Sequence, residues 1–79
     1  MQSSDIYRTL TPIFRDVFDD ETIAVVPELS ADHVDGWDSL NHIRLMLSVQ
    51  KAFGVKFSAQ EISRLKTVGD LVELVHAKL

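Results

Sequence analysis

Residues 39–53 limit the possible fold more than any other segment, because they form a long helical pattern that is apolar around most of its circumference. Gly36 permits a turn before the pattern, and Gly54 is well placed to end the helix. On a helical wheel one apolar group lies opposite a polar arc, and a second group lies beside that arc. The first group is Leu45, Met46, Val49, Ala52 and Phe53, and the second is Leu40, Ile43 and Leu47. A helix of this kind predicts packing against other helices.

Two further long helices and one short helix are predicted. Residues 4–18 carry apolar side chains at helical spacing, with Ser3 or Ser4 as the N-cap. Pro12 lies within this pattern and predicts a kink in one continuous helix, although Thr11 could instead cap a second segment. A capping-box pattern starts a short third helix at Ser58, and a second, weaker one starts a last helix at Thr67. This last helix is expected to present Val68, Leu71, Val72 and Val75 on one face, continued by Leu79.

A long loop separates the first two helices. Residues 22–37 include Pro27 and offer no second strand as a partner, so a strand is not predicted there. We expect residues 30–33 to form one helical turn, and Leu29, Val34 and Trp37 to anchor the loop on the helices. The predicted fold class is therefore all-α: a small bundle of three longer helices and one short helix, with a long loop between helices 1 and 2.

Composition excludes several classes of function. The chain has 79 residues, no cysteine and a formal net charge of −4. It is expected to form a single domain, residues 1–79, without a disulfide scaffold or a cysteine nucleophile. The acidic balance disfavours nucleic acid as a partner. No apolar run approaches the ~20 residues that span a bilayer, and no secretory signal is visible at the N-terminus. The sequence thus predicts a free-standing, monomeric cytoplasmic protein without a membrane partner.

Ser39 is the candidate functional residue, because it stands at the start of the most apolar helix. Asp38 or Ser39 can cap the first N–H groups of that helix, and a cap alone is the simplest interpretation of either residue. However, a hydroxyl at a helix N-terminus lies among unpaired N–H groups at the positive end of the helix dipole. This position favours a bound phosphodiester.

The sequence Asp38-Ser39-Leu40, at mid-chain of a small acidic helical protein, resembles the attachment motif of acyl carrier proteins. The resemblance extends over nearly the whole chain. It implies that Ser39 is esterified by phosphopantetheine, which a separate phosphopantetheinyl transferase delivers from coenzyme A. It also implies that the terminal thiol of this arm holds acyl groups as thioesters for acyl-loading and acyl-processing enzymes, and that the protein is not itself an enzyme. A peptidyl carrier protein is the close variant of this interpretation.

The resemblance further implies that partner enzymes contact the helix that Ser39 begins. An exposed patch of Leu40, Ile43 and Leu47 is the expected docking surface, and the adjacent Arg44 and Lys51 indicate that this side reaches water. The alternative is that the helix is central and nearly engulfed by its neighbours. Asp38 and Leu40 are additional candidates for contact with the transferase. In acyl carrier proteins this helix face is typically acidic, whereas here it is not. The difference favours a specialised route, such as polyketide or secondary metabolite synthesis, over bulk fatty acid synthesis.

Other chemistry is weakly supported. His33, His42 and His76 lack the spacing of a metal site and are interpreted as surface or packing residues, so no metal is predicted. Ser39 and His42 can meet on one helix, but no oxyanion-hole pattern accompanies them, which leaves a small hydrolase a remote alternative. A purely structural interaction module, in which Ser39 only caps the helix, is the alternative from another class. If a tethered acyl chain enters the bundle, Leu45, Met46 and Val49 are the expected lining residues.

Overall fold

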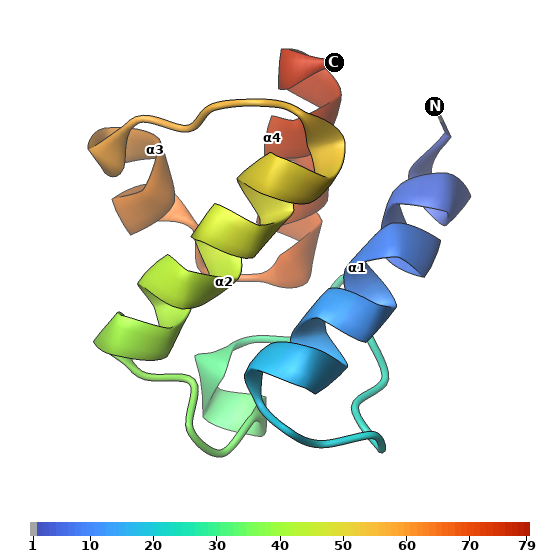
Figure 1. The fold of residues 1–79 in the computed structure, drawn as a ribbon, viewed down its shortest axis with the longest axis vertical. Helices are drawn as coiled ribbons and strands as arrows, with labels where there is room; N and C mark the ends of the chain where they lie inside the picture. Colours follow the sequence, from blue (N-terminus) through green and yellow to red (C-terminus); the bar gives the residue numbers. More distant parts are fainter. Residues whose placement is uncertain (1) are drawn as a thin grey trace.

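The computed structural model describes residues 2–79 and contains helices with no strand in that range. The elements are α1 (Ser3–Val17), the 3₁₀ turn η1 (Ala31–His33), α2 (Ser39–Phe53), α3 (Ala59–Arg64) and α4 (Val68–Lys78). Helix α1 packs against both α2 and α4, and the short α3 lies across α2 from α1 in the view of Figure 1. The predicted all-α bundle is therefore confirmed. No helix within residues 2–79 is long and apolar enough to cross a membrane.

Helix α1 runs without interruption through Pro12 and ends one residue before the predicted end. Its N-cap is Gln2, whose backbone N–H donates to the Asp5 carboxylate, so the prediction of Ser3 or Ser4 as the cap is wrong. The hydrogen bond from Gln2 N–H to the Asp5 carboxylate closes the first turn, and Ser3 and Ser4 lie inside that turn as helical residues. The face that α1 turns to the core consists of Ile6, Leu10 and Phe14, all fully buried.

The core lies between the apolar faces of α1, α2 and α4. Helix α2 contributes Leu45, Met46 and Val49, and α4 contributes Val68, Leu71, Val72 and Val75. Burial of each such side chain favours folding by roughly 1.5–3 kcal/mol. Leu79 is largely exposed, so the prediction that it continues the buried face of α4 is wrong. Helix α2 ends at Gly54, whose φ of 67° is the left-handed conformation that glycine adopts without strain.

The long loop between α1 and α2 is fixed at both ends and in its middle. Its backbone carbonyls at Pro27 and Leu29 accept hydrogen bonds from the first two N–H groups of α4, at 3.0 and 2.9 Å. The predicted helical turn is present as η1. Val34 is buried and Trp37 is half-buried in the core, so the loop is anchored as expected. This loop delivers the chain to the start of α2 in a defined position.

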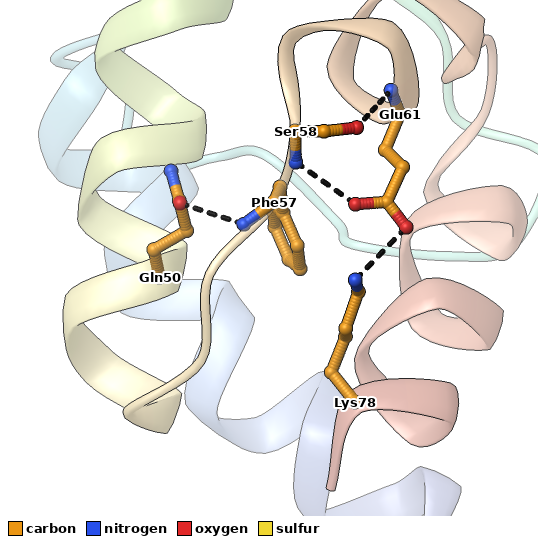
Figure 2. Close-up of polar contacts among 5 residues, drawn as sticks. All are labelled: Gln50, Phe57, Ser58, Glu61 and Lys78. Atoms are coloured by element: carbon orange, nitrogen blue, oxygen red, sulfur yellow. Dashed lines mark hydrogen bonds and ion pairs between the residues drawn. The ribbon is translucent and has the colours of Figure 1, made fainter.

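Helix α3 has no fully buried residue, although Ile62 is partly buried against the core, and polar contacts hold the helix as well. The predicted capping box is present: Ser58 N–H donates to Glu61 at 2.8 Å, and Glu61 N–H donates to the Ser58 hydroxyl at 3.1 Å. Figure 2 shows two further ties, one to each neighbouring helix. Gln50 of α2 accepts from Phe57 N–H at 2.8 Å, and Lys78 of α4 lies 3.0 Å from the Glu61 carboxylate. These polar contacts and the partly buried Ile62 together position α3.

Candidate functional site at the start of α2

Asp38, and not Ser39, caps α2. The Asp38 carboxylate accepts from Asn41 N–H at 2.8 Å, and the Asp38 carbonyl accepts from His42 N–H at 2.8 Å. Gly36 makes the preceding turn with a φ of 86°, and its carbonyl accepts from the Asn41 side chain at 2.7 Å. Capping by Asp38 leaves the hydroxyl of Ser39 without a hydrogen bond to any other residue in the described part of the chain.

The geometry at Ser39 suits a covalently held phosphate. Ser39 is exposed and is the first residue of α2. The N–H groups of Ser39 and Leu40 have no partner among residues 2–79, and they point along the positive end of the helix dipole. A phosphodiester on the Ser39 oxygen would lie close to these two donors. Because no positive side chain is needed to hold it, the arm beyond the phosphate can remain mobile.

A groove of about 1040 Å³ opens beside Ser39. Its walls come from the end of the long loop, the first turn of α2, helix α3 and the segment that leads into α4. The apolar part of this lining is Ala31, Trp37, Ile43, Ala59, Ile62 and Leu65. Leu45, Met46 and Val49 do not line the groove but are buried in the core, and their role as lining of a bound acyl chain stays a prediction.

His42 is the residue whose role the sequence did not indicate. Its two ring nitrogens contact the Trp37 indole N–H and the Ile62 carbonyl, each at 3.0 Å. Neither nitrogen is directed to Ser39, so the pair does not form the nucleophile and base of a hydrolase. The packing interpretation of His42 is thus correct, but its partner on α3 could not be predicted from the sequence.

The predicted docking surface is exposed. Leu40, Ile43 and Leu47 retain 68%, 52% and 61% of their surface, and Arg44 and Lys51 beside them are exposed as well. The alternative, in which α2 is engulfed by its neighbours, is therefore wrong. Charge is also unevenly distributed: residues 39–60 contain no Asp or Glu, while the rest of the chain holds all 12 acidic residues.

The acidic turn after α1 has a local structural role. The Asp20 carboxylate accepts from the N–H and the hydroxyl of Thr22, at 2.9 and 2.6 Å. These hydrogen bonds, with the hydroxyl contributing most, lower the pKa of Asp20 below its ordinary value. No group of three or more His, Cys, Asp or Glu side chains within residues 2–79 is arranged to hold a metal ion.

Comparison with known proteins agrees with the geometry at Ser39. A family model described as "Phosphopantetheine attachment site" matches residues 8–75. An acyl carrier protein of Coprothermobacter proteolyticus is 30% identical over 79 residues, which is 100% of this chain and 96% of that protein. The chain belongs to the acyl carrier protein family. It is also 30% identical to an acyl carrier protein of Thermosynechococcus vestitus, over 100% of this chain and 98% of that one.

A solved relative confirms the acyl carrier fold. The solution structure of a holo acyl carrier protein from Geobacter metallireducens superposes with a TM-score of 0.84 at 47% identity. The match covers 91% of this chain and 83% of that one. As a member of the family, the protein is a carrier and not an enzyme: it bears phosphopantetheine covalently. It interacts with a phosphopantetheinyl transferase and with acyl-processing enzymes.

Proposed function

We propose that Ser39 is the attachment residue and that this carrier presents acyl groups, as thioesters of the arm, to separate biosynthetic enzymes. The observation that supports this assignment is that two neighbouring residues have separate roles at the start of α2. Asp38 makes the cap, so the exposed Ser39 hydroxyl is free to react. When bound, phosphopantetheine supplies the thiol that this cysteine-free chain lacks.

The reaction at Ser39 is a phosphoryl transfer in which the transferase supplies the catalysis. The Ser39 oxygen attacks the phosphorus of coenzyme A that bears the pantetheine, and a new P–O bond forms. The bond to the bridging pyrophosphate oxygen breaks, and adenosine 3′,5′-bisphosphate leaves. The serine proton passes to a base of the transferase. The unpaired N–H groups of Ser39 and Leu40 then face the negative phosphodiester.

Intact mass spectrometry tests this assignment. The apo-protein is incubated with coenzyme A, Mg²⁺ and a broad-specificity phosphopantetheinyl transferase. We expect a gain of one phosphopantetheine that is absent in Ser39→Ala and retained in Ser63→Ala. Ser63 is a matched control, because it is an exposed serine on the same groove. A folded protein that gains no mass would contradict the proposal. The chain would then be interpreted as a structural interaction module, in which Ser39 only belongs to the segment that starts α2.

The same proposal assigns partner docking to the exposed face of α2. Leu40, Ile43 and Leu47 form an apolar stripe, and Arg44 and Lys51 give its border a positive charge. The complementary partner surface is apolar with acidic residues at its edge. Enzymes with basic docking surfaces would instead meet like charges. We therefore propose service in a specialised pathway, such as polyketide or other secondary metabolite synthesis, and not in bulk fatty acid synthesis.

A charge exchange tests the docking assignment. Arg44→Glu combined with Lys51→Glu should raise the rate at which fatty acid synthase enzymes use the acylated carrier, because repulsion from their basic surfaces becomes attraction. Arg8→Glu with Arg64→Glu is the control, since it changes net charge equally at exposed positions of α1 and α3. Equal rates for both double variants would contradict a docking role for Arg44 and Lys51.

We further propose that the carrier acts as a cytoplasmic monomer without a membrane partner. Coenzyme A, the donor of the arm, is a cytoplasmic metabolite, and transient docking to several enzymes requires the α2 face to stay free. Light scattering of the purified carrier at increasing concentration tests the monomer. A stable dimer that buries Leu40 and Leu47 would overturn this part of the proposal.

A further inference from the structure

Three segments of the chain meet at His42. The indole N–H of Trp37, at the end of the long loop, donates to His42 Nδ1 at 3.0 Å. On the other side of the ring, His42 Nε2 lies 3.0 Å from the carbonyl oxygen of Ile62 in α3. A single side chain of α2 therefore joins the loop to α3 at the groove beside Ser39.

The donors and acceptors fix the form of the imidazole. An indole N–H can only donate and a carbonyl oxygen can only accept. Nδ1 must therefore carry no proton, and Nε2–H must donate to Ile62. Both hydrogen bonds are made only by the neutral ring in this one tautomer. The bridge is sensitive to any change that removes the acceptor at Nδ1 or the donor at Nε2.

The loop end of the bridge is packed into the aromatic part of the core, whereas the α3 end is only partly buried. The Trp37 ring packs edge-on against Phe14 at a centroid distance of 5.5 Å and lies 5.6 Å from Phe18. Phe14 is fully buried in α1. In contrast, α3 has no buried residue, and its other ties are at its start, through Phe57, and to Lys78. The hydrogen bond between His42 and the Ile62 carbonyl holds α3 on the side that faces the groove.

We propose that His42 is a positioning residue that holds α3 against α2 and so sets the groove in which a tethered apolar acyl group is sheltered. The inference rests on the proposed attachment at Ser39, which places the arm at the mouth of this groove. His42, Ile43 and Ile62 all line it. When the bridge breaks, α3 moves more freely, the groove loses a wall, and the thioester spends more time in water.

The experiment compares thioester lifetimes. Wild type, His42→Leu and His42→Gln are loaded by the transferase with the acyl-arm of dodecanoyl-coenzyme A, and cleavage by hydroxylamine is followed by intact mass. We expect His42→Leu to be cleaved about fivefold faster, the ratio that the net contribution of one neutral hydrogen bond supplies. His42→Gln retains one acceptor and one donor and should stay within about twofold of wild type. His76→Leu, at an exposed histidine of α4, is the control and should match wild type.

Hydrogen exchange provides the second measurement. In His42→Leu the amides of α3 should exchange faster, while those of α1 and α4 keep their protection. Trp37→Phe removes one hydrogen bond to His42 but keeps an aromatic ring. If His42→Leu fails to fold, this variant replaces it, and its α3 amides should also exchange faster than those of wild type. Equal cleavage of His42→Leu and wild type would overturn the proposal. Equally fast cleavage of His42→Gln and His42→Leu would also overturn it, because packing alone would then explain the effect.

Failure of this inference is distinguishable from failure of the attachment proposal. Every variant is first checked for loading by intact mass. A wild-type protein that does not load refutes attachment at Ser39, whereas variants that load fully but do not differ from wild type in cleavage refute the role of His42 alone.

Discussion

Helices α3 and α4 begin with the same device and are stabilised by different forces. Each starts with a capping box, Ser58 with Glu61 in α3 and Thr67 with Asp70 in α4. Helix α4 then buries Val68, Leu71, Val72 and Val75, whereas no residue of α3 is fully buried. The contrast shows that a start signal places a helix in the sequence, but buried side chains decide whether it is part of the core. Here the helix without fully buried residues forms one wall of the groove beside Ser39.

Truncation of one apolar side chain in α4 and one in α3 should give the largest difference in the free energy of unfolding. Leu71→Ala in α4 leaves a cavity in the core and should lower the free energy of unfolding by about 2–5 kcal/mol. Ile62→Ala in α3 should cost about 1 kcal/mol or less, because Ile62 is only partly buried and its carbonyl still accepts from His42. Urea unfolding followed by circular dichroism measures both. Equal losses would mean that α3 is part of the cooperative core.

The same contrast explains which features could be predicted from sequence. Local signals were sufficient for α2, since Gly54 ends it at Phe53, and for the capping box at Ser58. The N-cap of α1 was missed, because glutamine is an uncommon cap and Ser3 and Ser4 offered the preferred side chains. Leu79 fits the periodicity of α4, but the helix has no neighbour there to bury it.

The candidate site also contains features that the sequence predicts and features that it does not. The sequence indicated a cap at Asp38 or Ser39 and did not decide between them, whereas the structure shows that Asp38 makes the cap. The role of His42 did not follow, because its partner Ile62 is 20 residues away and the Trp37 ring is oriented by α1. Hydrogen bonds between side chains of different segments depend on tertiary packing, which periodicity does not specify.

Removal of the N-cap hydroxyls of α3 and α4 should give a smaller loss of stability and should also distinguish the two helices. Ser58→Ala and Thr67→Ala each delete a hydroxyl that accepts one N–H group, and such a loss typically costs about 1 kcal/mol. In α4 the loss should appear in the global free energy of unfolding, because that helix unfolds with the core. In α3 it should appear as faster local amide exchange. If Ser58→Ala instead lowers global stability as much as Thr67→Ala, the proposed independence of α3 is wrong.

The acid sensitivity of α3 should be the smallest effect. The pKa of Glu61 is lowered from its ordinary value of 4.5, first by the Ser58 backbone N–H and then by the hydrogen bond with Lys78 (Figure 2). Because folding lowers this pKa, the stabilisation is fully present above the ordinary value and is lost as the pH falls through the lowered one. Protection of the α3 amides should therefore decrease below about pH 4.5 while α4 keeps its buried contacts. Glu61→Gln should start with weaker protection and lose less of it on acidification, whereas Glu73→Gln, at an exposed position of α4, should behave as wild type. An identical acid response in wild type and Glu61→Gln would show that other groups control α3, and the polar contacts of Figure 2 would then not explain its position.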